Sequence, residues 1–151
     1  MRTPILLLTV FTMAGCSTLT LQNVDFNWPV ESVLTVDRNG TIEDPERGIT
    51  ANLTALSVEE FQDSATVRGM RIHMIRSHEG YYFFTAPRFK RVYVFTPGER
   101  ELTLKSAIEV APQGLREPAL NQRPPHIELI DPALATPIRL TNDGILRGEK
   151  Q

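Results

Sequence analysis

The chain has 151 residues with a formal net charge of -2, and it contains 9 Gly, 11 Pro and a single Cys. These counts exclude a collagen-like or low-complexity polymer. The hydrophobic fraction of 41% and the low net charge exclude an intrinsically disordered chain. The length is typical of one domain, which at about 150 residues buries about two thirds of its unfolded surface and needs no disulfide.

The first sixteen residues have the layout of a targeting signal. One basic residue, Arg2, precedes a short, mostly apolar run that begins at Ile5, and the segment closes with the small residues Ala14-Gly15 before Cys16. This order is typical of a secretory signal peptide, and the run is shorter than the roughly 20 residues that span a bilayer. The closing residues resemble the lipobox of bacterial lipoproteins, although Met13 stands where that family most often has Leu.

The resemblance implies that residues 1–15 are removed and that the thiol of Cys16 carries a diacylglycerol, with no other cofactor. Two or more acyl chains anchor a protein stably to a membrane. Ser17 follows the Cys in place of Asp, which resembles an outer-membrane sorting signal. We therefore expect a cell-envelope protein anchored in the outer membrane, facing either the periplasm or the surface. Residues 16–25 would serve as a tether, residues 26–146 as the globular domain and residues 147–151 as a tail.

Alternation of apolar and polar residues is the dominant pattern after the signal, and it predicts strands with one buried face. Such strands are expected at Val30–Asp37, Gly48–Leu56, Met70–Met74 and Glu101–Val110. In the last of these the pattern places Leu102, Leu104, Ser106, Ile108 and Val110 on one face.

Two further segments, Tyr81–Phe84 and Val92–Phe95, are apolar at every position and predict central strands of a sheet. Ile127–Ile130 and Ile138–Leu140 are shorter candidates. Turn residues separate these runs at intervals that are typical of an antiparallel sandwich or a small barrel.

One short helix and one irregular segment complete the predicted fold. Ser57 and Glu60 have the spacing of a capping box, which predicts a helix that begins at Ser57 and ends before Asp63. Six prolines between residues 111 and 137 predict an ordered but irregular crossing, with Arg123-Pro124-Pro125 extended. The predicted fold is mainly β: a single antiparallel β-sandwich or small β-barrel with one short helix and a Pro-rich irregular segment.

Catalytic and metal-binding groupings are weak in this sequence. His73, His78 and His126 could converge with Glu79 on a metal, but a strand His and a turn His are the favoured interpretation because no metal-ligand spacing is present. No serine stands in a G-x-S-x-G elbow. The carboxylates around Pro45 (Glu43, Asp44 and Glu46) lack calcium-loop spacing and favour a solvated acidic turn. We assign no catalytic residue and no metal ligand.

Charge is segregated along the chain. Residues 17–63 carry nine acids and two bases, whereas residues 64–98 carry six bases and one acid. Arg forks bind phosphate and carboxylate, so the basic segment could hold an anionic headgroup, a polysaccharide or an acidic protein surface. The alternative, which we favour, is pairing with acids such as Glu31, Asp37 or Asp63. The candidate anion- or partner-binding residues are Arg68, Arg71, Arg76, Arg88, Lys90 and Arg91.

Aromatic residues within the basic segment offer a second candidate surface. Tyr81, Tyr82 and Phe89 could line a platform for a ligand, although aromatic residues at strand spacing more often belong to the core.

Three functional hypotheses follow from these patterns. The leading one is a non-enzymatic, membrane-anchored envelope lipoprotein that binds another envelope component as an accessory or structural subunit. Its partners would be the membrane, through the acyl chains, and a protein of an envelope assembly. The alternative is a ligand-binding module for an anionic glycan or lipid headgroup, and a remote alternative is an envelope hydrolase. Binding to nucleic acid is not expected of an exported, net acidic protein.

Overall fold

The computed structural model describes residues 30–99 and 101–146. They form a mainly β fold with eleven strands and one helix among the described residues. The predicted signal peptide, Cys16, the tether before residue 26 and the tail over 147–151 lie outside the described residues.

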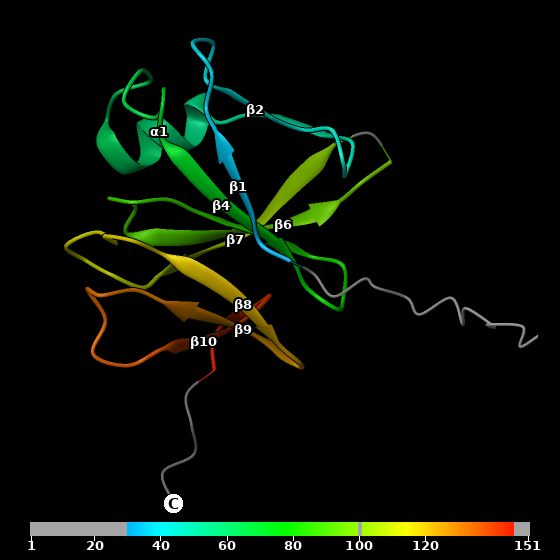
Figure 1. The fold of residues 1–151 in the computed structure, drawn as a ribbon, viewed down its shortest axis with the longest axis vertical. Coiled ribbons are helices and arrows are strands. Elements are labelled where there is room, and N and C mark those ends of the chain that lie inside the picture. Colours follow the sequence, from blue (N-terminus) through cyan, green and yellow to red (C-terminus); the bar gives the residue numbers. More distant parts are fainter. Residues whose placement is uncertain (1–29, 100, 147–151) are drawn as a thin grey trace, which may run out of the picture.

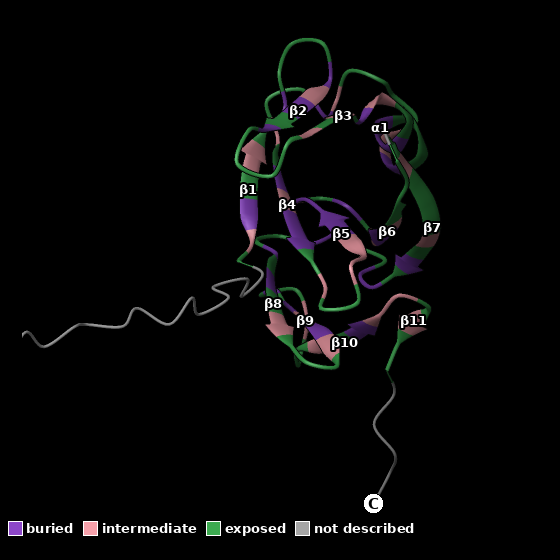
Figure 2. Cartoon of the chain, turned by 90° about the vertical axis from the view of Figure 1, so that its right-hand side faces the viewer, coloured by how far each residue is buried: buried purple, intermediate pink, exposed green. Residues whose placement is uncertain are grey.

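A five-stranded antiparallel sheet forms the middle layer, with the strand order β1-β4-β5-β6-β7. Its strands are β1 (Ser32–Thr35), β4 (Arg71–Arg76), β5 (Tyr82–Thr85), β6 (Arg91–Pro97) and β7 (Leu102–Glu109). The predicted central position of the two all-apolar segments is confirmed, because β5 and β6 are each flanked by strands on both sides. Their central residues are buried, as the purple segments of Figure 2 show, and they contribute to the cores on both faces of the sheet.

One face of the middle sheet packs against a second antiparallel sheet, which lies below it in Figure 1. The second sheet comprises β8 (Ala119–Arg123), β9 (His126–Ile130), β10 (Ile138–Thr141) and β11 (Gly144–Ile145). The core between the two sheets joins Phe83 and Val94 of the middle layer to Ile127 and Leu129 of β9. Each sheet is open, so the predicted antiparallel sandwich is confirmed in preference to a barrel.

The opposite face of the middle sheet is covered by a hairpin and the helix, which lie above it in Figure 1. The hairpin pairs β2 (Thr41–Asp44) with β3 (Ile49–Asn52), and the helix α1 spans Thr54–Phe61. A second core on this face includes Phe84, Phe89 and Tyr93. The molecule is therefore a sandwich with a third layer, and the middle sheet is buried from both sides.

The predicted capping box is wrong. The strand expected over Gly48–Leu56 ends at Asn52, and α1 begins at Thr54, so Ser57 lies inside the helix. The Ser57 hydroxyl donates to the Asp63 carbonyl and accepts from the Val67 N–H, and it is fully buried. Ser57 therefore fixes the loop that follows the helix instead of capping its start.

The expected single face of β7 is also wrong. The partners in β6 pass from Val94–Ser106 to Phe95–Leu104, so Lys105 is an extra residue in a β-bulge. Residues on opposite sides of the bulge face opposite sides of the sheet. Ile108 contributes to the core between the two sheets, whereas Leu102 packs against the core beneath the helix.

The Pro-rich segment contains a hairpin that the sequence did not predict. Its turn, Arg123-Pro124-Pro125-His126, contains a cis peptide bond between the two prolines, and it joins β8 to β9 in place of the extended conformation expected. Upstream, the Arg88 N–H donates to the Leu115 carbonyl and the Leu115 N–H donates to the Phe89 carbonyl. Gly114 has a positive φ of 85°, and a Cβ there would lie 2.8 Å from the Arg88 carbonyl oxygen, which requires glycine at this close approach.

The acidic turn is not wholly solvated. Asp44 is buried, and it accepts hydrogen bonds from Ser32 of β1 and from Arg47. Arg47 also donates to the Ser32 hydroxyl and to the Val30 carbonyl. Burial alone would raise the pKa of Asp44, but the hydrogen bonds from Arg47 and Ser32 outweigh it and hold the pKa below its ordinary value. This network ties the β2–β3 hairpin to the first strand.

Candidate functional site

An apolar pocket of about 370 Å³ lies between the third layer and the middle sheet. The residues that line it come from β3, α1, β5, β6, β7 and the residues next to them: Thr50, Ala51, Asn52, Leu53, Ala55, Leu56, Glu59, Phe84, Phe95, Glu101, Leu102 and Leu104. Figure 2 shows where the contributing elements lie, with β3 and α1 at the top and β7 along the right-hand side. The volume lies within the range of about 300–1,000 Å³ that is typical of ligand sites.

Three local features of the chain produce this pocket. The bulge at Lys105 turns Leu102 and Leu104 toward the helix side of the sheet. The edge-to-face pair of Phe84 and Phe95, whose ring centroids are 5.1 Å apart, forms part of the wall. The helix is only eight residues long, so it covers part of this sheet face and leaves Leu104 46% exposed.

Two carboxylates mark the open side of the pocket. Glu59 and Glu101 both line it and are exposed. The Oε1 atom of Glu59 lies 3.6 Å from Nη1 of Arg91, which is longer than a charge-assisted hydrogen bond of about 2.8 Å. Glu59 therefore keeps acceptor capacity for a further donor. The pocket combines an apolar wall with an acidic opening.

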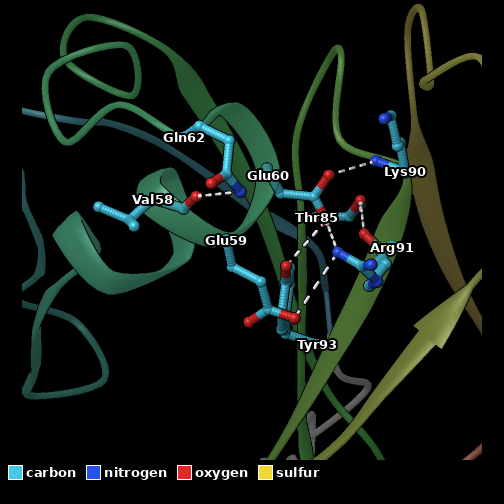
Figure 3. Close-up of polar contacts among 8 residues, drawn as sticks. All are labelled: Val58, Glu59, Glu60, Gln62, Thr85, Lys90, Arg91 and Tyr93. Carbon is cyan, nitrogen blue, oxygen red and sulfur yellow. Dashed lines mark hydrogen bonds and ion pairs between the residues drawn. The ribbon is translucent and has the colours of Figure 1, made fainter.

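A buried carboxylate, Glu60, holds the helix that forms one wall of the pocket (Figure 3). The Lys90 N–H and the Tyr93 hydroxyl donate to Glu60 at 2.8 Å each. Nη1 of Arg91 lies 3.4 Å from the same carboxylate and also reaches Glu59. The Glu60 side chain has no exposed surface, so no substrate reaches it. Its contacts fasten α1 to the start of β6.

Tyr93 is the group whose ionisation this network changes most. Burial, reinforced by the hydrogen bond to Glu60 and by its charge, raises the pKa of the Tyr93 phenol well above its ordinary value. A phenolate at this position would face a carboxylate in a desolvated site. The neutral phenol is therefore the form that the fold requires.

The structure divides the predicted basic residues between the two ends of the middle sheet. Arg71 begins β4 and Arg91 begins β6 at one end, whereas Arg76 ends β4 about 17 Å away at the other. In the part of the chain that the structure describes, the favoured internal pairing is found only for Arg91, whose partners are Glu59 and Glu60 instead of Glu31, Asp37 or Asp63, so this expectation is wrong for the other five. Among the described residues, no carboxylate oxygen lies within 4.0 Å of the exposed cations Arg68, Arg71, Arg76, Arg88 and Lys90.

The predicted aromatic surface does not form as a unit. Phe89 is fully buried and packs edge-to-face with Phe61 and Tyr93, which corrects its assignment to an exposed platform. Tyr81 and Tyr82 are half-buried at the far end of the sheet. The guanidinium of Arg76 lies 5.6 Å from the centre of the Tyr82 ring, so one basic residue and one aromatic residue of the prediction do meet.

The histidines occupy separate structural roles. Nδ1 of His73 lies 2.9 Å from Oε1 of Glu31, an atom that also accepts from the Leu120 N–H, so this contact joins the two sheets. His126 stands in the β8–β9 turn opposite Arg123. Within residues 30–99 and 101–146, no group of three or more His, Cys, Asp or Glu side chains is placed to hold a metal ion.

The sequence did not predict the pocket. Its lining comes from segments up to 54 positions apart (50–104), and Leu102 and Leu104 have the same apolar alternation as an ordinary half-buried strand. Thr103 and Lys105 are polar on either side of Leu104, as in any alternating strand, so the local sequence gives no sign of the bulge.

Comparisons of this chain with protein-family models, with curated proteins and with solved structures find no match in any of the three. The helix within the described part of the chain is too short to cross a bilayer.

Proposed function

We propose that the chain is a membrane-anchored, non-enzymatic envelope lipoprotein that acts as an accessory subunit by binding another envelope component. The observation that carries this proposal is the apolar pocket, because its wall can bury an apolar group of a partner. The resemblance of residues 1–16 to a lipoprotein signal supports the anchoring at Cys16. The partner would meet the domain close to the membrane surface.

The anchoring is tested by fractionating cells that express the full chain or its Cys16→Ala variant. The wild-type chain is expected in the membrane fraction and the variant in the soluble fraction, because the thiol that would receive the lipid is removed. Equal membrane attachment of the two would contradict the anchoring.

Partner binding is tested by isolating the full chain from membranes in a mild detergent. The wild-type chain is expected to bring a stoichiometric partner, and Ala55→Trp is expected to lose it because the indole would obstruct the pocket. Ala55 is exposed on α1, so the substitution leaves the core intact. Ala135→Trp, at an exposed position beyond β9, is the matched control. Isolation of a lone monomer would contradict the accessory-subunit proposal.

Binding of an anionic headgroup is the second candidate function. The observation that favours it is the set of exposed cations without a carboxylate partner among the described residues, of which Arg71 and Arg88 lie near one end of the middle sheet. The Cys16→Ala chain, which cannot receive the proposed lipid, is expected to cosediment with vesicles containing anionic lipid more than with zwitterionic vesicles. Adding Arg71→Gln and Arg88→Gln to this chain should remove the difference, whereas adding Arg139→Gln on β10 should not. Equal sedimentation of the Cys16→Ala chain with both kinds of vesicle would contradict this function.

A further inference from the structure

We infer that the pocket receives an extended segment of a partner protein in which an apolar side chain is accompanied by Lys or Arg. This inference rests on the proposed function and specifies the chemistry of its partner. It combines three features of the same site: the apolar wall, the acidic opening and the strand edges beside it.

The apolar wall of the pocket favours an apolar side chain in the partner segment. Phe95, Leu102 and Leu104 come from the sheet, and Leu53 and Leu56 come from the opposite side. The exposed Leu104 lies on the sheet wall, so an aliphatic or aromatic side chain placed there would cover surface that now faces water. Burial of apolar surface is favourable and independent of direction. The apolar wall therefore contributes to the affinity for the partner segment but does not fix the direction in which that segment lies.

The acidic opening of the pocket favours basic side chains next to that apolar residue. Glu59 and Glu101 stand beside the apolar wall, and they would repel the phosphate or carboxylate headgroup of a lipid whose acyl chain entered the pocket. A Lys or Arg beside the inserted apolar residue would instead find two acceptors. Opposite charge therefore favours a basic peptide segment over an anionic lipid.

The strand edges favour an extended partner. Among the described strands, β3 pairs only with β2 and β7 pairs only with β6, so each has one edge without a strand partner. Both strands contribute residues to the pocket. An extended segment can pair with such an edge while every second side chain points toward the pocket. Consequently, the basic residues of the partner would lie two positions before and after the apolar one.

The test uses the full chain, isotope-labelled and held in a mild-detergent micelle, and the peptide Ser-Lys-Thr-Leu-Thr-Lys-Ser as the probe. Its binding is followed by the amide chemical shifts of the protein. Saturable shifts are expected at Asn52, Ala55 and Leu102, with no change at Ala133 in the loop after β9. Peptides with Leu replaced by Ser, or with both Lys replaced by Glu, should bind at least about tenfold more weakly.

Two protein variants separate the two parts of the inference. Ala55→Trp should abolish binding, and Glu59→Gln with Glu101→Gln should weaken it about fivefold and reduce its dependence on salt. Ala135→Trp and Glu128→Gln on β9 are the matched controls, which should bind as the wild type does. Shifts that are equal in the controls and in the pocket variants would overturn the inference.

Dodecanoate is the competing probe. If it binds at the pocket more tightly than the peptide and without dependence on Glu59 and Glu101, the site is a lipid site and the inference fails. If the peptide does not bind but Ala55→Trp still loses the membrane partner, the proposed accessory function stands and only the basic-apolar chemistry is wrong. If the peptide binds as expected but no partner is isolated, the chemistry stands and the accessory function fails.

Discussion

The side chain of Glu60 holds α1 against the middle sheet. Its carboxylate is buried and accepts from the backbone of Lys90 and from the hydroxyl of Tyr93. Without this acceptor, both donors would be left in a desolvated site, where an unpaired polar group costs about 1–3 kcal/mol. The pocket wall therefore depends on a residue that does not line the pocket.

We expect Glu60→Leu to lower the free energy of unfolding by about 2–4 kcal/mol, because it leaves the two donors unpaired and Arg91 without its closer carboxylate. The neighbouring Glu59→Gln, whose side chain is 43% exposed, should change it by less than about 0.5 kcal/mol. Urea denaturation followed by circular dichroism measures both. Equal decreases in the free energy of unfolding for the two variants would contradict a specific stabilisation by the buried Glu60 carboxylate.

Tyr93 predicts a dependence of stability on alkaline pH. Its pKa in the folded chain lies above the ordinary value of 10.0, so the folded state holds the phenolic proton more tightly than the unfolded chain does. The stabilisation is complete below pH 10 and is lost as the pH rises toward the pKa of the folded state. Each pH unit in that interval should lower the free energy of unfolding by about 1.4 kcal/mol.

Comparison with Tyr93→Phe isolates this effect, since the other titrating groups are common to both proteins. Urea denaturation at pH 9, 10 and 11 should show a steeper decline for the wild type than for Tyr93→Phe. Parallel declines would contradict a raised pKa at this tyrosine.

At the scale of elements, α1 and the bulge in β7 depart most from the sequence prediction. A Ser followed three positions later by Glu is a frequent helix start, but Ser57 and Glu60 both point to groups outside the helix. Local spacing would assign both side chains to a cap, but they bind tertiary partners instead: Ser57 binds the loop at Val67, and Glu60 binds the connection at Lys90 just before β6.

A single substitution distinguishes the two roles of Ser57. Asp is as good an N-cap as Ser, so Ser57→Asp would be neutral if Ser57 capped the helix. In the structure it would bury a charge beside the Asp63 carbonyl. We therefore expect Ser57→Asp to lower the melting temperature by about 8 °C or more, and Ser64→Asp in the exposed loop to leave it within about 2 °C. Thermal melts that match for the two variants would contradict the buried position.

At the scale of the whole molecule, the middle sheet belongs to both cores. Phe83 packs toward the second sheet, whereas the adjacent Phe84 packs toward the helix and hairpin. Because the two cores share the backbone of β5, loss of either one removes the support of the other. The three layers should therefore unfold together.

Phe83→Leu and Phe84→Leu test this cooperativity from opposite faces. Each is expected to lower the free energy of unfolding by about 1–2 kcal/mol and to retain one transition with an unchanged dependence on urea. Circular dichroism and the exchange of amide hydrogens in β9 and α1 provide independent probes. A Phe84→Leu variant in which α1 exchanges at a lower urea concentration than β9 would show that the third layer unfolds by itself.

The sequence by itself determined the mainly β class and the central place of the Tyr81–Phe84 and Val92–Phe95 segments. These follow from the periodicity and the apolar content of contiguous residues, which local physics controls. Only the tertiary structure decided the third layer, the bulge at Lys105 and the pocket. Each of them depends on contacts between distant segments, such as Glu60 with Lys90, and a bulge reverses the faces of a strand without changing its pattern of residues.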